Sequence, residues 1–280
     1  MPEKISERNK FKLKKAARAS RSWVVWLGRA GYSAMAVVHL LVGVLAALSV
    51  FGIAAAIGTR GAMRQMAELP FGQILLVAVA FGLVCHAFWR IAQALFDTDA
   101  KGADAKGFVL RGGFFLIALF YLGLAFSAAR IVLGFKIKSG VWAQSWTAWL
   151  LAQPYGQWLV ALAALIAAGI GIFHFYQAFS AKFRETLQLA EMSEKQAKWG
   201  TRFGRFGFAA RGIVFGIVGF FLLFAAVRFD AGETRSFGGA LDVLEQQPYG
   251  AWLLAVVAAG LFSYGIFMIF LARFRRMVGD

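Results

Sequence analysis

A single cysteine, Cys85, is present in the sequence, so no disulfide can form within the chain. Its place inside an apolar run indicates a buried structural thiol. Charge is also scarce, because only 16% of the 280 residues are charged and they gather at the ends of long apolar runs. A soluble helical domain interleaves charges with apolar stripes, and that pattern is absent. The sequence therefore excludes a disulfide-stabilised domain and an ordinary soluble one.

Apolar residues make up 60% of the sequence and fall into six runs. Each run is near or above the ~20 residues that a helix needs to cross a bilayer. We therefore predict an all-α integral membrane protein with six transmembrane helices. The runs cover residues 31–57, 71–96, 112–134, 155–181, 210–228 and 249–272.

Basic residues are distributed unequally between the two sides that six crossings define. Of the 30 lysines and arginines, 23 lie in the N-terminal segment, the second and fourth connections and the C-terminal tail. Lysine and arginine favour cytoplasmic loops, so we expect both termini in the cytoplasm. This asymmetry also accounts for the net charge of +16. No basic stretch is interleaved with stacking aromatics, so we expect no nucleic-acid partner.

A short motif of proline, an aromatic residue and glycine occurs three times, in each case at the start of an even-numbered apolar run. A short amphipathic stretch precedes each copy, as expected of a helix that lies along the membrane surface. Proline is favoured at the first position of a helix, so we expect each proline to open the helix that follows. We therefore predict three tandem hairpin repeats with short amphipathic surface helices before each turn. The three motifs are Pro70-Phe71-Gly72, Pro154-Tyr155-Gly156 and Pro248-Tyr249-Gly250.

The odd-numbered runs carry a second repeated motif. Gly28-Arg29 matches Gly204-Arg205, and Arg111-Gly112 is aligned with Arg211-Gly212. Gln93 and Gln177 align on the even-numbered runs. The resulting division is a basic cytoplasmic segment at 1–27, hairpin repeats at 28–97, 98–181 and 204–273, a basic helical cytoplasmic linker at 182–203, and a cytoplasmic tail at 274–280.

These motifs resemble the bacterial membrane proteins of the domain of unknown function 1206 family. Members carry three copies of a two-helix unit with a G-[YF]-x-x-A-R-G-like entry and a P-[FY]-G turn. The third copy here, with Ala210-Arg211-Gly212, matches best, whereas the first departs at Met35. The resemblance covers residues 28–276 and implies a fold and a location, but no activity and no catalytic residue.

Two histidines are candidates for a cofactor site, because ionisable groups inside a membrane are often functional. His39 and His86 lie within the first two apolar runs, which form one hairpin, so their rings are expected to be able to meet. Paired imidazoles are ligands for haem or a metal. The competing interpretation is that both are buried histidines hydrogen-bonded between helices. No carboxylate lies nearby in sequence to orient the rings.

A polar helix face is the candidate for lipid or partner binding. His86, Trp89, Arg90 and Gln93 share one helix side by their spacing. Such a face can bind a headgroup in the cytoplasmic leaflet, since arginine is a good phosphate ligand. Alternatively, Arg90 extends to the membrane interface and Trp89 anchors the helix there. The further arginines considered for lipid or partner binding are Arg111 and Arg211.

The most favoured function is that of a non-enzymatic inner-membrane protein that binds lipids or a partner, with a role in assembling or stabilising another complex. The partner is a membrane protein or a second copy. An enzyme is not expected, because no nucleophile–base pair or metal-ligand spacing is present. The first alternative is a channel or transporter for an uncharged or apolar substrate along the pseudo-threefold axis. The second is binding of haem or a metal by His39 and His86, although no cofactor is required by the sequence.

Overall fold

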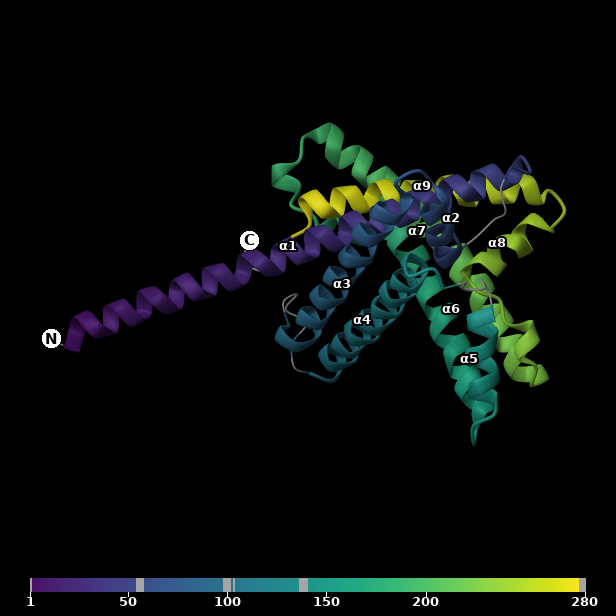
Figure 1. The fold of residues 1–280 in the computed structure, drawn as a ribbon, viewed down its shortest axis with the longest axis horizontal. Helices are drawn as coiled ribbons and strands as arrows, with labels where there is room; N and C mark the ends of the chain where they lie inside the picture. The colour runs from purple at the N-terminus through teal and green to yellow at the C-terminus, as the bar shows by residue number, and fades with distance from the viewer. Residues whose placement is uncertain (1, 54–57, 98–101, 103, 136–140, 277–280) are drawn as a thin grey trace.

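A computed structural model describes residues 2–53, 58–97, 102, 104–135 and 141–276 (Figure 1). Among these residues the structure has six helices that are long and apolar enough to cross a membrane. The protein is therefore an all-α multi-pass membrane protein, as the sequence predicts. The six helices are α1 (Pro2–Val50), α3 (Gly72–Phe96), α4 (Ala105–Val132), α6 (Gly156–Ser180), α7 (Glu194–Arg228) and α9 (Gly250–Phe274).

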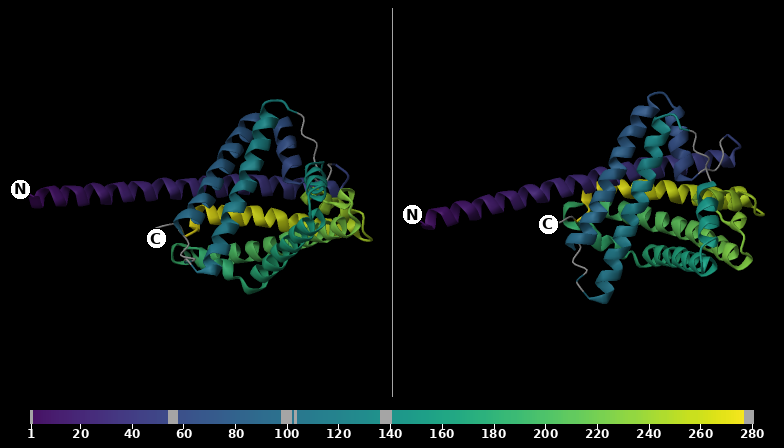
Figure 2. Two further views of the ribbon diagram at one scale, coloured as in Figure 1. Left: turned by 90° about the horizontal axis from the view of Figure 1, so that it is seen from below. Right: turned by 60° about the horizontal axis from the view of Figure 1, so that its bottom comes forward.

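Helix α1 is longer than a membrane span requires. Its apolar part covers Val25–Val50, and the helix extends back to Pro2. Figures 1 and 2 show this N-terminal extension projecting away from the body of the protein. The basic segment predicted at 1–27 is therefore helical and continuous with the first span from Pro2 onward.

Three short helices precede the even-numbered spans, and they are the predicted surface helices. They are α2 (Thr59–Glu68), α5 (Val141–Leu151) and α8 (Phe237–Glu245). Helix α2 contacts α8, and Gly58 lies against Gly238 at the starts of the two helices. We call the side of the membrane that carries them the surface-helix face.

The proline motif forms a tight turn between each surface helix and the next span. In the first copy, Gly72 N–H donates to the carbonyl oxygen of Leu69 at 2.8 Å, and Phe71 has φ 59° and ψ 8°. Proline in the second position and a positive φ in the third define a type II turn. Tyr155 and Tyr249 have the same left-handed conformation. The prediction that proline opens each helix is wrong, because the helices begin two residues later, at the glycine.

The residue types of the turn follow from its geometry. A Cβ on Gly72 would overlap the carbonyl oxygen of Met66, since the span starts directly against the last turn of the surface helix. Gly156 and Gly250 have equivalent contacts. An aromatic residue in the left-handed region is strained. Its side chain is exposed here, by 83% for Phe71 and 80% and 84% for its two counterparts, as expected of aromatic anchors at a membrane interface.

The opposite side of the membrane carries both chain ends and the α3–α4 and α6–α7 connections, and we call it the terminal face. Residues 182–193 form two short 3-10 turns (Lys182–Thr186 and Leu189–Glu191), so the linker predicted at 182–203 is α-helical only from Glu194 onward. Backbone hydrogen bonds from Gln188 to Phe274 and from Arg276 to Thr186 hold this connection against the end of α9. The predicted tail at 274–280 lies outside the described residues from 277 onward.

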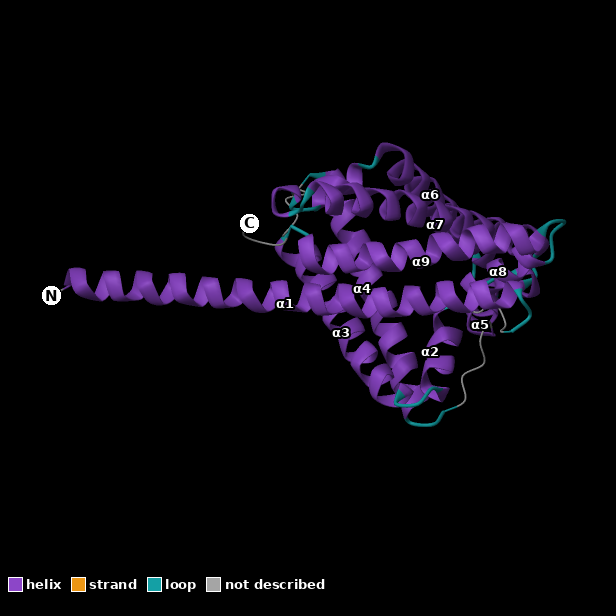
Figure 3. Ribbon diagram, turned by 90° about the horizontal axis from the view of Figure 1, so that it is seen from above, coloured by secondary structure: helices purple, strands orange, loops and turns teal. Residues whose placement is uncertain are grey.

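Helices α6, α7, α9 and α1 pack side by side in that order, and α3 and then α4 continue the series (Figure 3). The two helices of the first repeat, α1 and α3, pack together, and so do α7 and α9 of the third. In the second repeat α4 and α6 run apart, and no substantial packing joins them in the part of the chain that the structure describes (Figure 1). The series is therefore open at the second repeat rather than closed into a ring.

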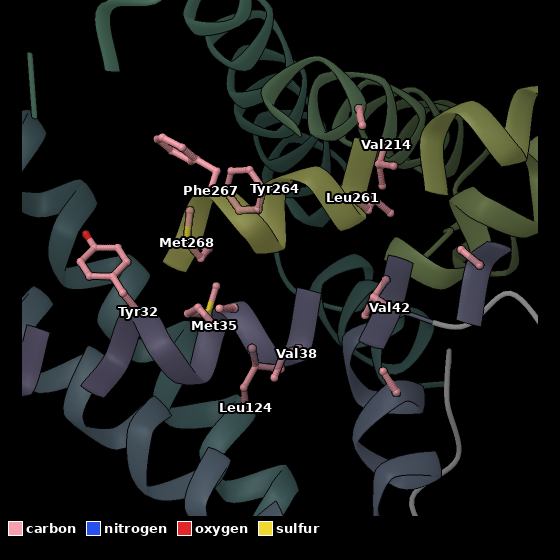
Figure 4. Packing of buried hydrophobic residues seen from close by; sticks show 14 of the residues in the cluster. Tyr32, Met35, Val38, Val42, Leu124, Val214, Leu261, Tyr264, Phe267 and Met268 are labelled. Carbon is pink, nitrogen blue, oxygen red and sulfur yellow. The ribbon is translucent and has the colours of Figure 1, made fainter. Parts of the chain in front are cut away.

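The main core lies where α1 and α9 meet. Figure 4 shows Met35 of α1 pointing toward α9, where Met268 is the nearest labelled side chain, whereas Val38 lies beside Leu124 of α4. Backbones approach closely here, because a Cβ on Gly43 would lie 2.6 Å from the backbone nitrogen of Phe262. Such close contact through small residues is how membrane helices gain packing energy without a hydrophobic driving force.

Candidate functional site

The centre of the candidate site is Arg211, which lies within the long helix α7. It is six residues beyond Arg205, whose guanidinium binds the last carbonyls of α6. Six residues correspond to roughly 9 Å along a helix. Arg211 is therefore embedded in the membrane-spanning part of the bundle, at a distance from the terminal face.

The guanidinium of Arg211 joins three other helices. Its Nη1 lies 2.8 Å from Nε2 of His39 on α1, and its Nε donates to Nε2 of His174 on α6 at 3.4 Å. It also lies over the ring of Tyr264 on α9, with 4.5 Å between the guanidinium carbon and the ring centroid. Cation–π contact and neutral imidazole acceptors are the partners that an arginine without a carboxylate uses.

The hydrogen bonds assign the protonation of His39. Its Nδ1 lies 2.8 Å from the carbonyl oxygen of Met35, which can only accept, so Nδ1 carries the proton. Nε2 of the neutral ring then accepts from Arg211. His39 is therefore a positioned acceptor for the arginine.

A second arginine, Arg90, occupies a similar depth in α3. It lies six residues before the helix ends at Phe96, again roughly 9 Å from the terminal face. Its Nε donates to Nε2 of His86 at 3.4 Å, and its Nη1 donates to Oε1 of Gln93 at 2.9 Å. His86, Arg90 and Gln93 therefore lie together on one side of α3, as their spacing predicts, and binding of a lipid or partner by this face stays a prediction. Trp89 is fully buried, so the interpretation of it as an interfacial anchor is wrong.

Aromatic rings pack around the histidine that Arg90 contacts. His86 packs edge-on against Tyr121 of α4 and Tyr32 of α1, with ring centroids 4.6 and 5.0 Å apart. Helix α1 supplies Tyr32 to this site and His39 to the Arg211 site, and these two residues are seven positions apart, on one face of the helix. We call the set listed next the arginine–histidine cluster. Its members are Tyr32, His39, His86, Arg90, Gln93, Tyr121, His174, Arg211 and Tyr264.

The structure does not pair His39 with His86 as haem ligation would require. His39 faces Arg211 and Tyr264, whereas His86 faces Arg90, Tyr32 and Tyr121. Nε2, a common ligand atom of histidine, is directed at an arginine in both rings. Within the described residues no group of three metal-ligating side chains is found. Haem binding by His39 and His86 stays a prediction, which the Soret absorbance of the purified protein tests.

Hydrogen-bond donors exceed acceptors in and beside the cluster. Four buried donors have no partner among the described residues, namely His86 Nδ1, His174 Nδ1, Tyr32 Oη and Trp89 Nε1. The two imidazole nitrogens carry protons, because their Nε2 atoms accept from arginine. One buried acceptor, Oε1 of Gln177, also has no hydrogen-bond partner among the described residues. Buried polar groups are normally paired, so an acceptor that reached these donors would be stabilised by them.

Negative charge is also absent from the cluster as far as the structure describes it. The described ion pairs join Arg64 to Glu68 and Arg228 to Glu233, both at the surface-helix face. Neither involves Arg90 or Arg211. Two cations embedded in the membrane normally pair with an anion or line a polar pathway. The chemistry of the cluster therefore suits binding of an anionic group.

Arg111 has a different role from Arg211, so their alignment in the sequence is wrong. Arg111 Nε and Nη2 donate to the carbonyl oxygens of Ala94 and Leu95 at the end of α3. Arg205 uses the same two nitrogens on Ala178 and Phe179 at the end of α6. Both arginines therefore cap the C-terminus of the preceding span, where carbonyls lack helical partners and attract cations.

Loss of this cap is expected to destabilise the protein moderately. Arg205→Gln removes two charge-assisted hydrogen bonds, so we expect a loss of about 1 kcal/mol of stability. Arg29→Gln is the matched control, because Arg29 is exposed and makes no side-chain hydrogen bond within the described structure. Thermal unfolding in detergent measures both. Equal melting temperatures for the two variants would contradict the capping role.

Sequence reasoning missed Arg211 as the centre of the site, along with its partners His174, Tyr121 and Tyr264. One signal was present: Gly204, Gly207 and Arg211 follow helical spacing, so Arg211 shares a face with two small residues. A Cβ on Gly207 would lie 2.6 Å from Cα of Tyr264, which shows that this face is packed.

Comparisons with known proteins agree with the repeat architecture. The family described as Domain of Unknown Function (DUF1206) matches residues 30–97, 112–181 and 206–275. The chain is 33% identical over 268 residues to the uncharacterized protein YxxB of Bacillus subtilis (strain 168), covering 96% of this chain and 97% of the relative. No solved structure gives a significant match. Arg29, Arg111 and Arg205 each directly precede a matched repeat, so Arg111 corresponds to Arg205 rather than to Arg211.

Proposed function

The chain belongs to the Domain of Unknown Function (DUF1206) family, and from that premise we propose that it is a non-enzymatic protein of the bacterial cytoplasmic membrane that binds a lipid or a membrane protein partner. The binding supports the assembly or stability of a membrane complex. The observation that carries this proposal is the arginine–histidine cluster, in which all six membrane-spanning helices contribute residues around two embedded arginines and several unpartnered buried donors.

The composition of the cluster favours binding over catalysis. Acid–base catalysis needs a group that takes up and releases a proton near the substrate. In this cluster Nε2 of His39, His86 and His174 already accepts from an arginine, so the basic nitrogens are engaged. Arginine stays protonated, so it binds anions rather than transferring protons.

The proposed orientation places the terminal face in the cytoplasm. Of the 30 lysines and arginines, 23 belong to the segments on this face. Positive residues favour the cytoplasmic side of a membrane. The two embedded arginines then lie closer to the cytoplasmic leaflet than to the outer one.

Native mass spectrometry of the protein, released from vesicles of its own membrane without prior detergent, tests the binding function. We expect a population with one or more additional masses that survive mild activation. The added mass identifies a lipid or a protein, and a haem would be recognised by its mass and colour. A bare chain in all charge states, unchanged after lipids of the same membrane are added back, would contradict the proposal.

A further inference from the structure

We infer that the arginine–histidine cluster binds the phosphate group of an anionic lipid from the cytoplasmic leaflet, with the phosphate held between Arg90 and Arg211. This inference rests on the proposed binding function and adds the chemistry of the ligand, its position and the residues that select it.

The charge of the site requires an anion. Arg90 lies roughly 9 Å before the end of α3, and Arg211 lies roughly 9 Å beyond Arg205, the residue that caps the end of α6. They form no ion pair in the described structure, and their present partners are neutral imidazoles, an amide and aromatic rings. A lipid phosphodiester carries one negative charge, so it offsets one of the two positive charges and accepts hydrogen bonds from both guanidinium groups.

The number of donors favours phosphate over carboxylate. Each guanidinium has nitrogen donors that its present partners do not use, because Arg211 engages Nε and Nη1 and Arg90 engages the same two atoms. Tyr121, which packs on the His86 ring, adds a hydroxyl donor on the Arg90 side of the cluster. A phosphodiester has two charged non-bridging oxygens, as a carboxylate does, and two ester oxygens in addition, and it pairs with arginine through two parallel hydrogen bonds.

The open second repeat explains how a lipid reaches the site. Tyr121 belongs to α4 and His174 to α6, the two helices that do not pack against each other. The cluster therefore spans the two sides of this opening. Exposed apolar side chains on both helices, such as Phe120 and Ile170, provide the surface for acyl chains. A headgroup in the cluster leaves the chains in the bilayer, so no closed pocket is needed.

Titration of delipidated protein with defined ligands tests the inference. Native mass spectrometry is used to compare phosphatidylglycerol, phosphatidylcholine, oleate and inorganic phosphate, at equal concentration, on the full-length chain. We expect phosphatidylglycerol to bind at least about tenfold more tightly than phosphatidylcholine or oleate. Arg90→Gln and Arg211→Gln are each expected to weaken it about tenfold, as loss of a charge-assisted contact predicts.

Two further variants test whether the loss of phosphatidylglycerol affinity is specific to the cluster. Arg205→Gln removes an arginine that caps α6 outside the cluster and should leave phosphatidylglycerol affinity unchanged. Tyr121→Phe removes only a hydroxyl and is used if an arginine variant fails to fold. It should weaken phosphatidylglycerol and leave phosphatidylcholine unaffected.

The outcomes separate this inference from the proposed function. Equal binding of oleate, displacement of the lipid by inorganic phosphate at a similar concentration, or cluster variants that match Arg205→Gln would each overturn the anionic-lipid site. In those cases the protein still binds a ligand, and the proposed function stands. If none of the four ligands binds and the native-membrane preparation is also bare, the proposed function itself fails.

Discussion

Replacing Gly207 by alanine is expected to destabilise the protein by about 1–3 kcal/mol, because overpacking forces two backbones apart. A Cβ at this position of α7 would lie 2.6 Å from Cα of Tyr264 on α9. Gly31 is its counterpart in the first repeat, where a Cβ would lie 2.6 Å from the Cβ of His86. We expect Gly31→Ala to be similarly harmful, since neither contact ends in a flexible side chain.

The second repeat supplies a matched control. Counted from the starts of the matched repeats, Gly113 is equivalent to Gly31 and Gly207, yet a Cβ there meets nothing within 4 Å. Gly113→Ala is therefore expected to be neutral or to stabilise by about 0.5–1 kcal/mol, from the higher helix propensity of alanine. Thermal unfolding followed by size-exclusion chromatography compares the three variants. A Gly113→Ala variant as unstable as Gly207→Ala would show that α4 and α6 pack after all.

The sequence explains why the second repeat is open. In the first and third repeats, a Cβ on Gly82 or Gly260 would overlap an alanine of the paired helix, at Ala34 and Ala210. The equivalent residues of the second repeat are Leu116 and Ile166, both large and exposed. Two branched side chains cannot reproduce a glycine–alanine contact, so the close approach of backbones is lost.

Replacing Arg211, His39 and His174 together by apolar residues is expected to abolish anionic-lipid binding without lowering the stability of the protein. Each residue takes the side chain of its equivalent in another repeat, which gives Arg211→Met, His39→Phe and His174→Met. Well-packed apolar replacements of buried charged groups are often neutral or stabilising by about 1–4 kcal/mol. We therefore expect the triple variant to melt at or above the wild-type temperature and to lose anionic-lipid binding.

The single variant Arg211→Met shows whether the stability of the triple variant depends on replacing all three residues together. It leaves Nε2 of His39 and of His174 without a donor, so we expect it to be less stable than the triple variant. Melting temperature and phosphatidylglycerol affinity are measured on the same preparations. A triple variant that unfolds well below the wild type would mean that the cluster serves the fold rather than a ligand.

The fold could be predicted from sequence because its signals are local. Long apolar runs and the repeated Pro-[FY]-Gly turn specify the spans, the surface helices and the repeat. The role of proline in the turn was misjudged, because the helix-start preference of proline does not reveal that an aromatic residue would adopt a left-handed conformation after it.

The site could be predicted only in part, because it depends on contacts between repeats. Hairpin connectivity suggested that His39 and His86 face each other, but α1 also packs against α9, and His39 is directed to that side. Arg211 was grouped with Arg111, because the two Arg-Gly pairs were aligned with each other. Helix α7 in fact begins at Glu194, and the fold surrounds Arg211 with three other helices.

An experimental structure of the protein in nanodiscs made with phosphatidylglycerol tests the central claim most directly. The account predicts headgroup density between Arg90 and Arg211, within hydrogen-bond distance of the Tyr121 hydroxyl, and acyl chains along α4 and α6. A structure in which carboxylates of the chain itself pair with both arginines, with no lipid between them, would contradict it.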